Sequence, residues 1–236
     1  MILLIKLILA HLIGDFFFQP DKWVAAKEEK KLGAYQFYLH LLIHAAFILL
    51  LLWDLSFWPY LLVIVISHGI LDALKIYLQR EGNRRIWFFA DQAGHLLVIA
   101  GVAYWIAGEG WIPWQALGLE FWTILTIGAF LTRPAAFIIK TAMSKWTPFT
   151  DESESDSLAE AGKYIGILER LFAFAFIISG RWEAIGFLVA AKSVFRFGDL
   201  RQSKDRKLTE YILIGTLLSF GISILCGLIY AAITPA

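Results

Sequence analysis

Histidine and aspartate recur four residues apart in the apolar N-terminal part of this sequence. Residues with this spacing lie on one face of an α-helix, with Cβ atoms roughly 5–6 Å apart. All five histidines of the 236-residue chain belong to such pairs. The pairs are His11/Asp15, His40/His44, His68/Asp72 and Asp91/His95. Imidazole and carboxylate groups that face one another from neighbouring helices are a means by which helical bundles bind metal ions.

The elements that carry these pairs are long apolar segments. The chain is 59% hydrophobic and 17% charged, against about 45–50% and about 25% in soluble domains. We therefore predict an all-α fold, a polytopic integral membrane helical bundle of about eight transmembrane segments. The segments are residues 2–19, 38–55, 58–79, 86–107, 120–143, 163–179, 182–198 and 209–233. The sixth and seventh are short, so a re-entrant hairpin is an alternative to two crossings.

The predicted organisation is a single membrane domain, residues 1–236. A four-helix half, 1–107, carries the histidine and aspartate pairs, and a four-segment half, 120–236, follows it. The hydrophilic stretch 144–163 predicts an acidic cytoplasmic loop between apolar segments.

Lysine and arginine set the expected orientation, because cytoplasmic loops carry an excess of both. Thirteen lie in the loops 20–37, 79–86, 144–163 and 199–208, whereas Arg181 alone lies in the loops on the other side. This bias predicts a multi-pass protein of the bacterial cytoplasmic (inner) membrane with both termini outside. Alternating helix direction then brings all four pairs to one level, in the cytoplasmic third of the membrane.

This convergence predicts a centre for a divalent metal ion. Its candidate ligands are His11, Asp15, His40, His44, His68, Asp72, Asp91 and His95. A zinc ion keeps only three or four protein ligands. Either two ions therefore lie side by side, or some of the eight side chains orient the ligands of one ion. Nitrogen and oxygen ligands without thiolate favour zinc, with manganese or iron as alternatives. The competing interpretation is a set of hydrogen bonds between helices.

A second group of polar residues is basic and lies in the second half of the chain. Its members are Arg133, Lys140, Arg170, Lys192 and Arg196. Arginine binds phosphate and carboxylate groups through two parallel hydrogen bonds, so the group is a candidate anion site. The alternative is a set of internal ion pairs with Glu169 and Glu210.

The motifs resemble those of a bacterial membrane family known as domain of unknown function 3307. They are H-x-x-G-D-F-x-x-Q from His11, H-x-x-x-H from His40, H-x-x-x-D-x-x-K from His68 and D-Q-x-x-H from Asp91. The resemblance covers roughly residues 1–105, and the second half is similar to the C-terminal part of longer members. The family name implies no activity. The site layout is similar, more loosely, to inner-membrane proteins described as metal-dependent hydrolases.

Three functions are compatible with these observations. The first is an intramembrane metal-dependent hydrolase that acts from the cytoplasmic leaflet on an amphipathic, phosphate-containing substrate. In it, Asp15 or Asp91 is the general base, and Lys75 with the basic group neutralises substrate charge. The second is a transporter of a metal ion or small solute, which the aliphatic outer halves of the first four segments disfavour. The third is a non-catalytic membrane module with a structural metal.

The expected partners are therefore the lipid bilayer and an amphipathic substrate. The formal net charge of +1 gives no sign of nucleic-acid binding. No oligomeric state follows from the sequence.

Overall fold

The computed structural model of the protein describes residues 1–110, 117–146, 156–200 and 206–234, without the side chains of 156–161, 195–200 and 206–209. The described residues form α-helices, short 3-10 helices and turns, with no strand among them. The predicted all-α class is thus confirmed. The chain divides into two compact units, Met1–Ala129 and Phe130–Ala236. The expectation of one membrane domain stays a prediction.

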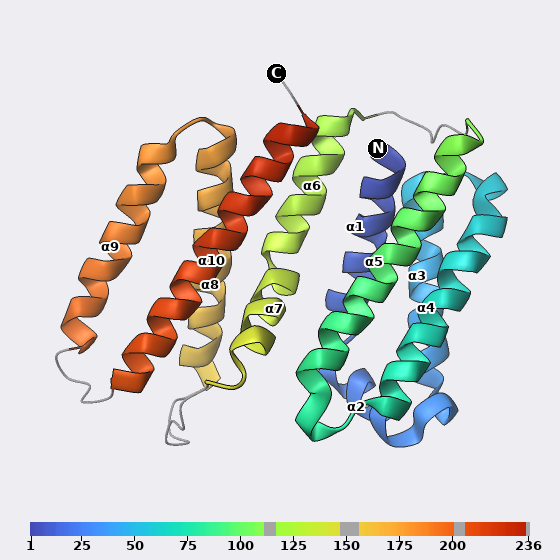
Figure 1. Ribbon diagram of the computed structural model, residues 1–236, viewed down its shortest axis with the longest axis horizontal. Helices are drawn as coiled ribbons and strands as arrows, with labels where there is room; N and C mark the ends of the chain where they lie inside the picture. Colours follow the sequence, from blue (N-terminus) through green and yellow to red (C-terminus); the bar gives the residue numbers. More distant parts are fainter. Residues whose placement is uncertain (111–116, 147–155, 201–205, 235–236) are drawn as a thin grey trace. The chain divides into compact units, whose positions relative to one another are not determined.

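The first unit is built around four long helices. These are α1 (Ile2–Phe16), α3 (Tyr35–Leu52), α4 (Trp58–Leu78) and α5 (Arg84–Gly108). Both α1 and α4 contact α3 and α5, so the four helices close a ring. The short helix α2 (Asp21–Lys30) lies across one end of this ring (Figure 1). Three 3-10 helices complete the connections: η1 (Lys31–Gly33), η2 (Leu55–Phe57) and η3 (Glu81–Asn83).

Local sequence signals set the helix ends. Pro20 precedes the first residue of α2 in an extended conformation, which ends the run of α1. Trp53 adopts a left-handed conformation (φ 51°) directly after α3. The Asp54 side chain then accepts a hydrogen bond from the Ser56 backbone N–H, and Pro59 lies in the first turn of α4. These turns set the axial offset between consecutive helices.

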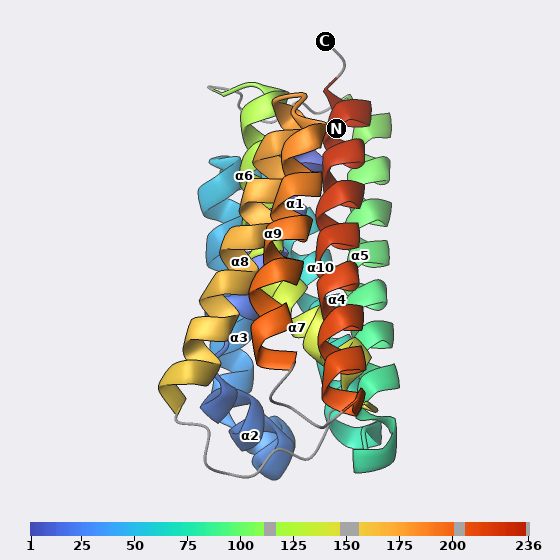
Figure 2. The same ribbon diagram turned by 90° about the vertical axis from the view of Figure 1, so that its left-hand side faces the viewer.

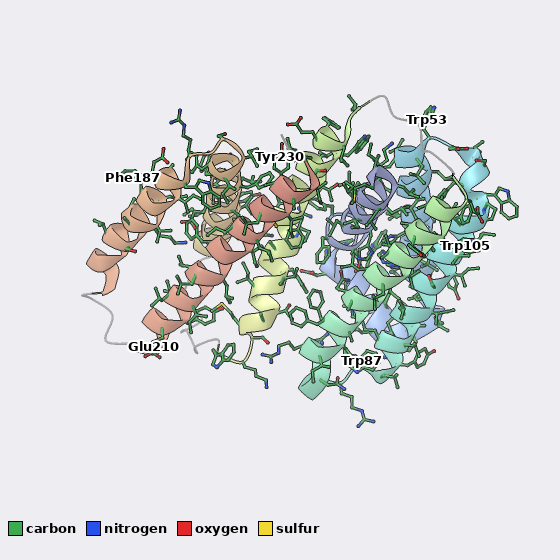
Figure 3. The ribbon with its side chains drawn as sticks, turned by 45° about the horizontal axis from the view of Figure 1, so that its top comes forward. Trp53, Trp87, Trp105, Phe187, Glu210 and Tyr230 are labelled. Atoms are coloured by element: carbon green, nitrogen blue, oxygen red, sulfur yellow. The ribbon has the colours of Figure 1, made fainter. Side chains whose placement is uncertain are left out.

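The first unit buries ionisable side chains and exposes apolar ones. On α5, Leu97 and Tyr104 are 73% and 85% exposed, whereas Asp91 and His95 are 4% and 2% exposed. Water would favour the reverse arrangement, because large exposed apolar surfaces are rare on soluble monomers. Trp87 and Trp105 lie toward opposite ends of α5 (Figure 3), as expected of an aromatic belt at each membrane surface. This distribution is compatible with a membrane protein.

Four helical segments are long and apolar enough to cross a membrane, and six are if each bent helix pair counts as one span. The four are Tyr35–Leu52, Leu55–Leu78, Glu81–Gly108 and Glu210–Ile233. The described residues thus support four to six spans and not clearly the predicted eight. The predicted sixth and seventh segments correspond to α8 (Asp156–Ile178) and α9 (Trp182–Leu200), which are not among the candidates.

Two predicted segments are broken helices. The run 2–19 is interrupted after α1, and the following Asp21–Gly33 is bent by 79° from it. With 15 residues, α1 is about 22 Å long, which is less than the roughly 30 Å of a hydrocarbon core. The run 120–143 consists of α6 (Leu119–Leu131) and α7 (Arg133–Met143), bent by 41°. Pro134 lies in the first turn of α7, directly after the break. Proline has no backbone N–H, so it cannot continue the hydrogen-bond ladder of α6.

The second unit contains α7, α8, α9 and α10 (Arg206–Ile233). Helix α8 contacts the other three, and α10 also contacts α7. Figure 2 shows α8, α9 and α10 side by side. Gly180, with φ +68°, makes the turn from α8 to α9, a conformation that favours glycine. The predicted sixth and seventh segments are therefore two consecutive helices joined by a tight turn.

An aliphatic core fills the end of the first unit that lies away from α2. It is formed by the first half of α1, the second half of α3, the first half of α4 and the second half of α5. Its buried members are Leu3, Leu7, Ala10, Ile48, Leu52, Phe57, Leu61, Ile64, Ile99, Val102, Ala103 and Ile106. The histidine and aspartate pairs occupy the other half of the same helices.

Candidate metal centre

The four helices of the first unit bring all eight predicted ligands together. Each helix supplies one i, i+4 pair, and each pair faces the interior of the ring. None of the five histidines is more than 4% exposed. The rings of His68 and His95 stack with centroids 3.9 Å apart, and those of His44 and His68 are 4.0 Å apart. Residues separated by up to 84 positions in the sequence therefore form one cluster.

Asp15 lies at the centre of the histidines. A hydrogen bond of 3.0 Å joins its Oδ1 to His44 Nε2. The Nε2 atoms of His40 and His68 lie 3.3 and 3.6 Å from the same oxygen. The Nε2 atoms of His40 and His68 are in turn 3.1 Å apart. Three imidazoles thus direct the same ring nitrogen toward one carboxylate oxygen.

Asp72 and Asp91 form the other side of the cluster with His95. His95 Nε2 lies 3.2 Å from Asp91 Oδ1 and 3.6 Å from Asp72 Oδ1. Asp72 Oδ2 also lies 3.7 Å from His40 Nε2. Asp72 therefore connects the two sides.

The ligand atoms fall into three overlapping groups. Within each group, the nitrogen and oxygen atoms lie within 4.8 Å of one another. The groups are His11, Asp15, His44 and His68; His40, His68 and Asp72; and Asp72, Asp91 and His95. Side chains of this type and spacing could hold a metal ion, and the donors fit zinc, manganese or iron.

Some buried polar atoms of the cluster have no hydrogen-bond partner. Among the described residues these include Nδ1 of His11, His40 and His95, Nε2 of His95, and Oδ1 of Asp91. Buried polar groups are normally paired, and an absent ion is one explanation when they are not. These atoms, like the ligand geometry, are compatible with a site that could hold a cation.

Two lysines enter the cluster and contact its carboxylates. Lys75 Nζ lies 2.8 Å from Asp91 Oδ2, and Lys27 Nζ lies 2.8 Å from Asp72 Oδ2. Lys75 is a residue that the motif predicts, whereas Lys27 is not. Lys27 comes from α2, is only 5% exposed, and reaches a residue 45 positions away. In the sequence it is one of several lysines in a polar connection, and no pattern there distinguishes it from the others.

Gln92 and Gly14 are two further residues that the i, i+4 pattern does not select. Gln92 donates a 2.7 Å hydrogen bond to Asp15 Oδ2, and its Oε1 lies 3.2 Å from His11 Nε2. A Cβ atom added at Gly14 would lie 2.5 Å from the His44 ring. Glycine is thus needed for α1 to approach His44 closely. Both residues are visible in the sequence motifs as direct neighbours of an aspartate: Gly14 precedes Asp15, and Gln92 follows Asp91.

A small cavity lies between the imidazoles and the aliphatic core. His11, His44, His68 and His95 line one side of it. Leu7, Ile48, Ile64, Val98 and Ile99 line the other, with Ser67 between them. Each of these five aliphatic residues is three or four residues, about one helical turn, from a histidine of the same helix. Polar and apolar walls therefore meet at the candidate ligands.

The predicted basic group in the second unit has internal partners where its contacts are described. Arg170 donates hydrogen bonds to the carbonyl oxygens of Leu131 and Thr132. Lys192 is paired with Glu169, as the alternative of internal ion pairs expects. Arg133 and Lys140 are exposed on α7, and the side chain of Arg196 lies outside those described. The anion site stays a prediction.

The fold and site define a class: a helical bundle with apolar outer faces and a buried cluster of side chains that could hold a metal ion. Residues 3–116 match the model of the family described as "Protein of unknown function (DUF3307)", so this part of the chain is similar to that family. The predicted resemblance is confirmed over these residues. No curated protein and no solved structure matches the chain, so function has to be inferred from the site.

Proposed function

We propose that residues 1–108 form an intramembrane metal-dependent hydrolase that acts on an amphipathic, phosphate-containing substrate. The observation that carries the proposal is the convergence of five imidazoles and three carboxylates from four helices whose outer faces are apolar. Ionisable groups are costly inside a bilayer and are retained there mainly for function. The proposal places the protein in the bacterial cytoplasmic membrane, with both termini outside and with α2 and the basic loops at the cytoplasmic surface.

The aliphatic core favours hydrolysis over transport. Of the twelve buried apolar residues of the core, four line the cavity and eight lie beyond it, including Leu52, Phe57 and Ile106. An ion path across the membrane needs polar groups or water along its length. In the described part of the first unit such groups are concentrated in one half. Lys6, Thr123 and Thr126 are buried exceptions, and the Thr126 hydroxyl donates a hydrogen bond to the Ile5 carbonyl. A site reached from one side suits an enzyme.

The proposed chemistry divides between the bound ion and two side chains. A bound divalent ion would act as a Lewis acid and activate a water molecule. Asp91 is our candidate for the general base, because its Oδ1 is buried 3.2 Å from His95 Nε2 within one of the three ligand groups. Lys75 holds the other oxygen of Asp91 and keeps a side chain that is 27% exposed. It is therefore placed to neutralise negative charge on a substrate.

The cavity between the histidines and the aliphatic residues has room for about one water molecule, which suits the attacking water of a hydrolysis. The amphipathic character of the proposed substrate rests instead on the apolar outer faces of the helices, which place the centre within a lipid bilayer. The proposed substrate class is a membrane lipid or a lipid-linked phosphate.

The test uses the full chain, purified in detergent without chelator and then incubated with phosphatidylglycerol vesicles. We expect bound metal and release of a water-soluble phosphate product. Asp91→Asn should retain the ion and lower the rate about 100-fold or more, as expected for loss of a general base. Asp54→Asn, at the start of η2, serves as the matched control and should leave the rate unchanged.

Two results would contradict the hydrolase. One is zinc flux into proteoliposomes that the same histidine changes block, without hydrolysis of phosphate or carboxylic esters, which would support transport. The other is a metal-loaded protein with neither hydrolysis nor flux, which would support a structural metal.

A further inference from the structure

We infer that Lys27 and Lys75 take the place of a second metal ion, so that the centre binds one divalent ion at His11, Asp15, His44 and His68. This inference rests on the proposed metal binding. It concerns how many ions are bound and where, and it adds Lys27, from outside the four long helices, to the centre.

The three carboxylates have different partners. Asp72 and Asp91 each have a lysine Nζ at 2.8 Å from Oδ2. Asp15 contacts no lysine in the described contacts; its oxygens are bonded to the neutral amide of Gln92 and to His44. Two carboxylates are thus neutralised from within the chain. Asp15 is the one that remains for an external cation.

The ligands around Asp15 complete one site. His11, His44 and His68 supply three ring nitrogens within 4.8 Å of one another and of the carboxylate. Three histidines and one carboxylate make the four ligands of a tetrahedral zinc site, or leave a position open when one of them does not bind. The group of Asp72, Asp91 and His95 supplies one nitrogen, and both of its carboxylates are held by lysine.

Charge leads to the same stoichiometry. Three carboxylates and two lysines leave one negative charge, which one divalent ion converts to one positive charge. Two ions beside both lysines would leave three positive charges within a few ångströms, in an environment that screens them poorly. If both lysines were replaced by neutral residues, three carboxylates and two divalent ions would leave one positive charge. The wild-type centre with one divalent ion has the same net charge. The two lysines therefore carry together the charge of one divalent ion.

Lys27 is held in place independently of the carboxylate that it binds. Lys31 Nζ donates a hydrogen bond to the Ile76 carbonyl at 2.7 Å, and Glu28 accepts hydrogen bonds from Gln79 and Arg84. Helix α2 should therefore remain docked when Lys27 is replaced. This makes a lysine substitution an informative probe of the charge alone.

The experiment counts ions per chain in the full protein saturated with zinc and freed of excess. We expect one ion in the wild type and two in the double variant Lys27→Met/Lys75→Met. Lys31→Met is the matched control on α2 and should keep one. Two ions in the wild type, or one in the double variant, would overturn the inference and leave the hydrolase proposal standing. No ion in the wild type would overturn both.

A second pair of variants tests the inference if the double variant does not fold. Asp15→Asn should lose the ion, whereas Asp72→Asn should keep it, because Lys27 and not the ion is its partner. If Asp72→Asn lost the ion and Asp15→Asn retained it, the ion would be bound beside Asp72 and not beside Asp15. That result would contradict the assignment.

Discussion

The two units of the chain bury charge in different ways. In the second unit, Arg170 is 4% exposed and all of its guanidinium nitrogens have acceptors: the carbonyl oxygens of Leu131 and Thr132 and the hydroxyl of Ser219. The two carbonyls belong to the break between α6 and α7, where helical hydrogen bonding stops. Arg170 therefore satisfies a defect of the backbone, and nothing further is needed to explain it.

In the first unit, the buried polar side chains face one another. Five imidazoles face three carboxylates, and Nδ1 of His11 and of His40 are among the described atoms without a hydrogen bond. The ligand atoms converge on one another instead of on the backbone. The comparison indicates that a buried charge is structural when its hydrogen bonds close within the fold, and functional when they converge and stay open.

The largest expected effect comes from His68→Ala, since His68 belongs to two of the three ligand groups. We expect the metal affinity to fall at least about 100-fold, because affinity depends on the number of ligands. The purified variant should then retain little or no metal. Metal analysis of the purified protein measures it. Ser67→Ala, whose hydroxyl bonds only to carbonyls of its own helix among the described contacts, is the control and should keep its metal. Equal metal content in the two variants would show that His68 is not a ligand, and the buried cluster of the first unit would then have no functional distinction from Arg170.

Arg170→Met sharpens the comparison from the other side. We expect a loss of about 1–3 kcal/mol in the free energy of unfolding, since two carbonyls lose a charged donor, with no change in bound metal. Thermal unfolding and metal analysis of the same sample measure both quantities. The exposed Arg181→Met should change neither. Loss of metal from Arg170→Met would show that the second unit takes part in the centre.

Gly14→Ala should have a smaller effect. The added Cβ would lie 2.5 Å from the His44 ring, so the ring has to move away from Asp15. We expect metal affinity to fall about 10-fold, as for changes that misorient a ligand. Competition with a zinc chelator measures this. Gly101→Ala, where an added Cβ meets nothing within 4 Å, is the control. Unchanged affinity in Gly14→Ala would contradict the role of His44.

The sequence predicted which side chains come together better than it predicted the helices. The i, i+4 spacing selected all eight side chains that the four helices bring together, because one helical face is a local property. Helix breaks were less visible: the runs 2–19 and 120–143 are apolar throughout, and only Pro20 and Pro134 mark their interruption. Lys27 was not predictable from spacing, because its contact with Asp72 depends on how α2 folds back across the bundle.

X-ray absorption at the metal edge, on the full chain purified without chelator, reports the ligands of the bound ion. For zinc, the account predicts a shell of nitrogen and oxygen ligands at roughly 2.0–2.1 Å with the multiple scattering of imidazole and no sulfur. This signal should be absent from His68→Ala. A folded protein without metal, or a metal whose shell contains no imidazole, would contradict the account.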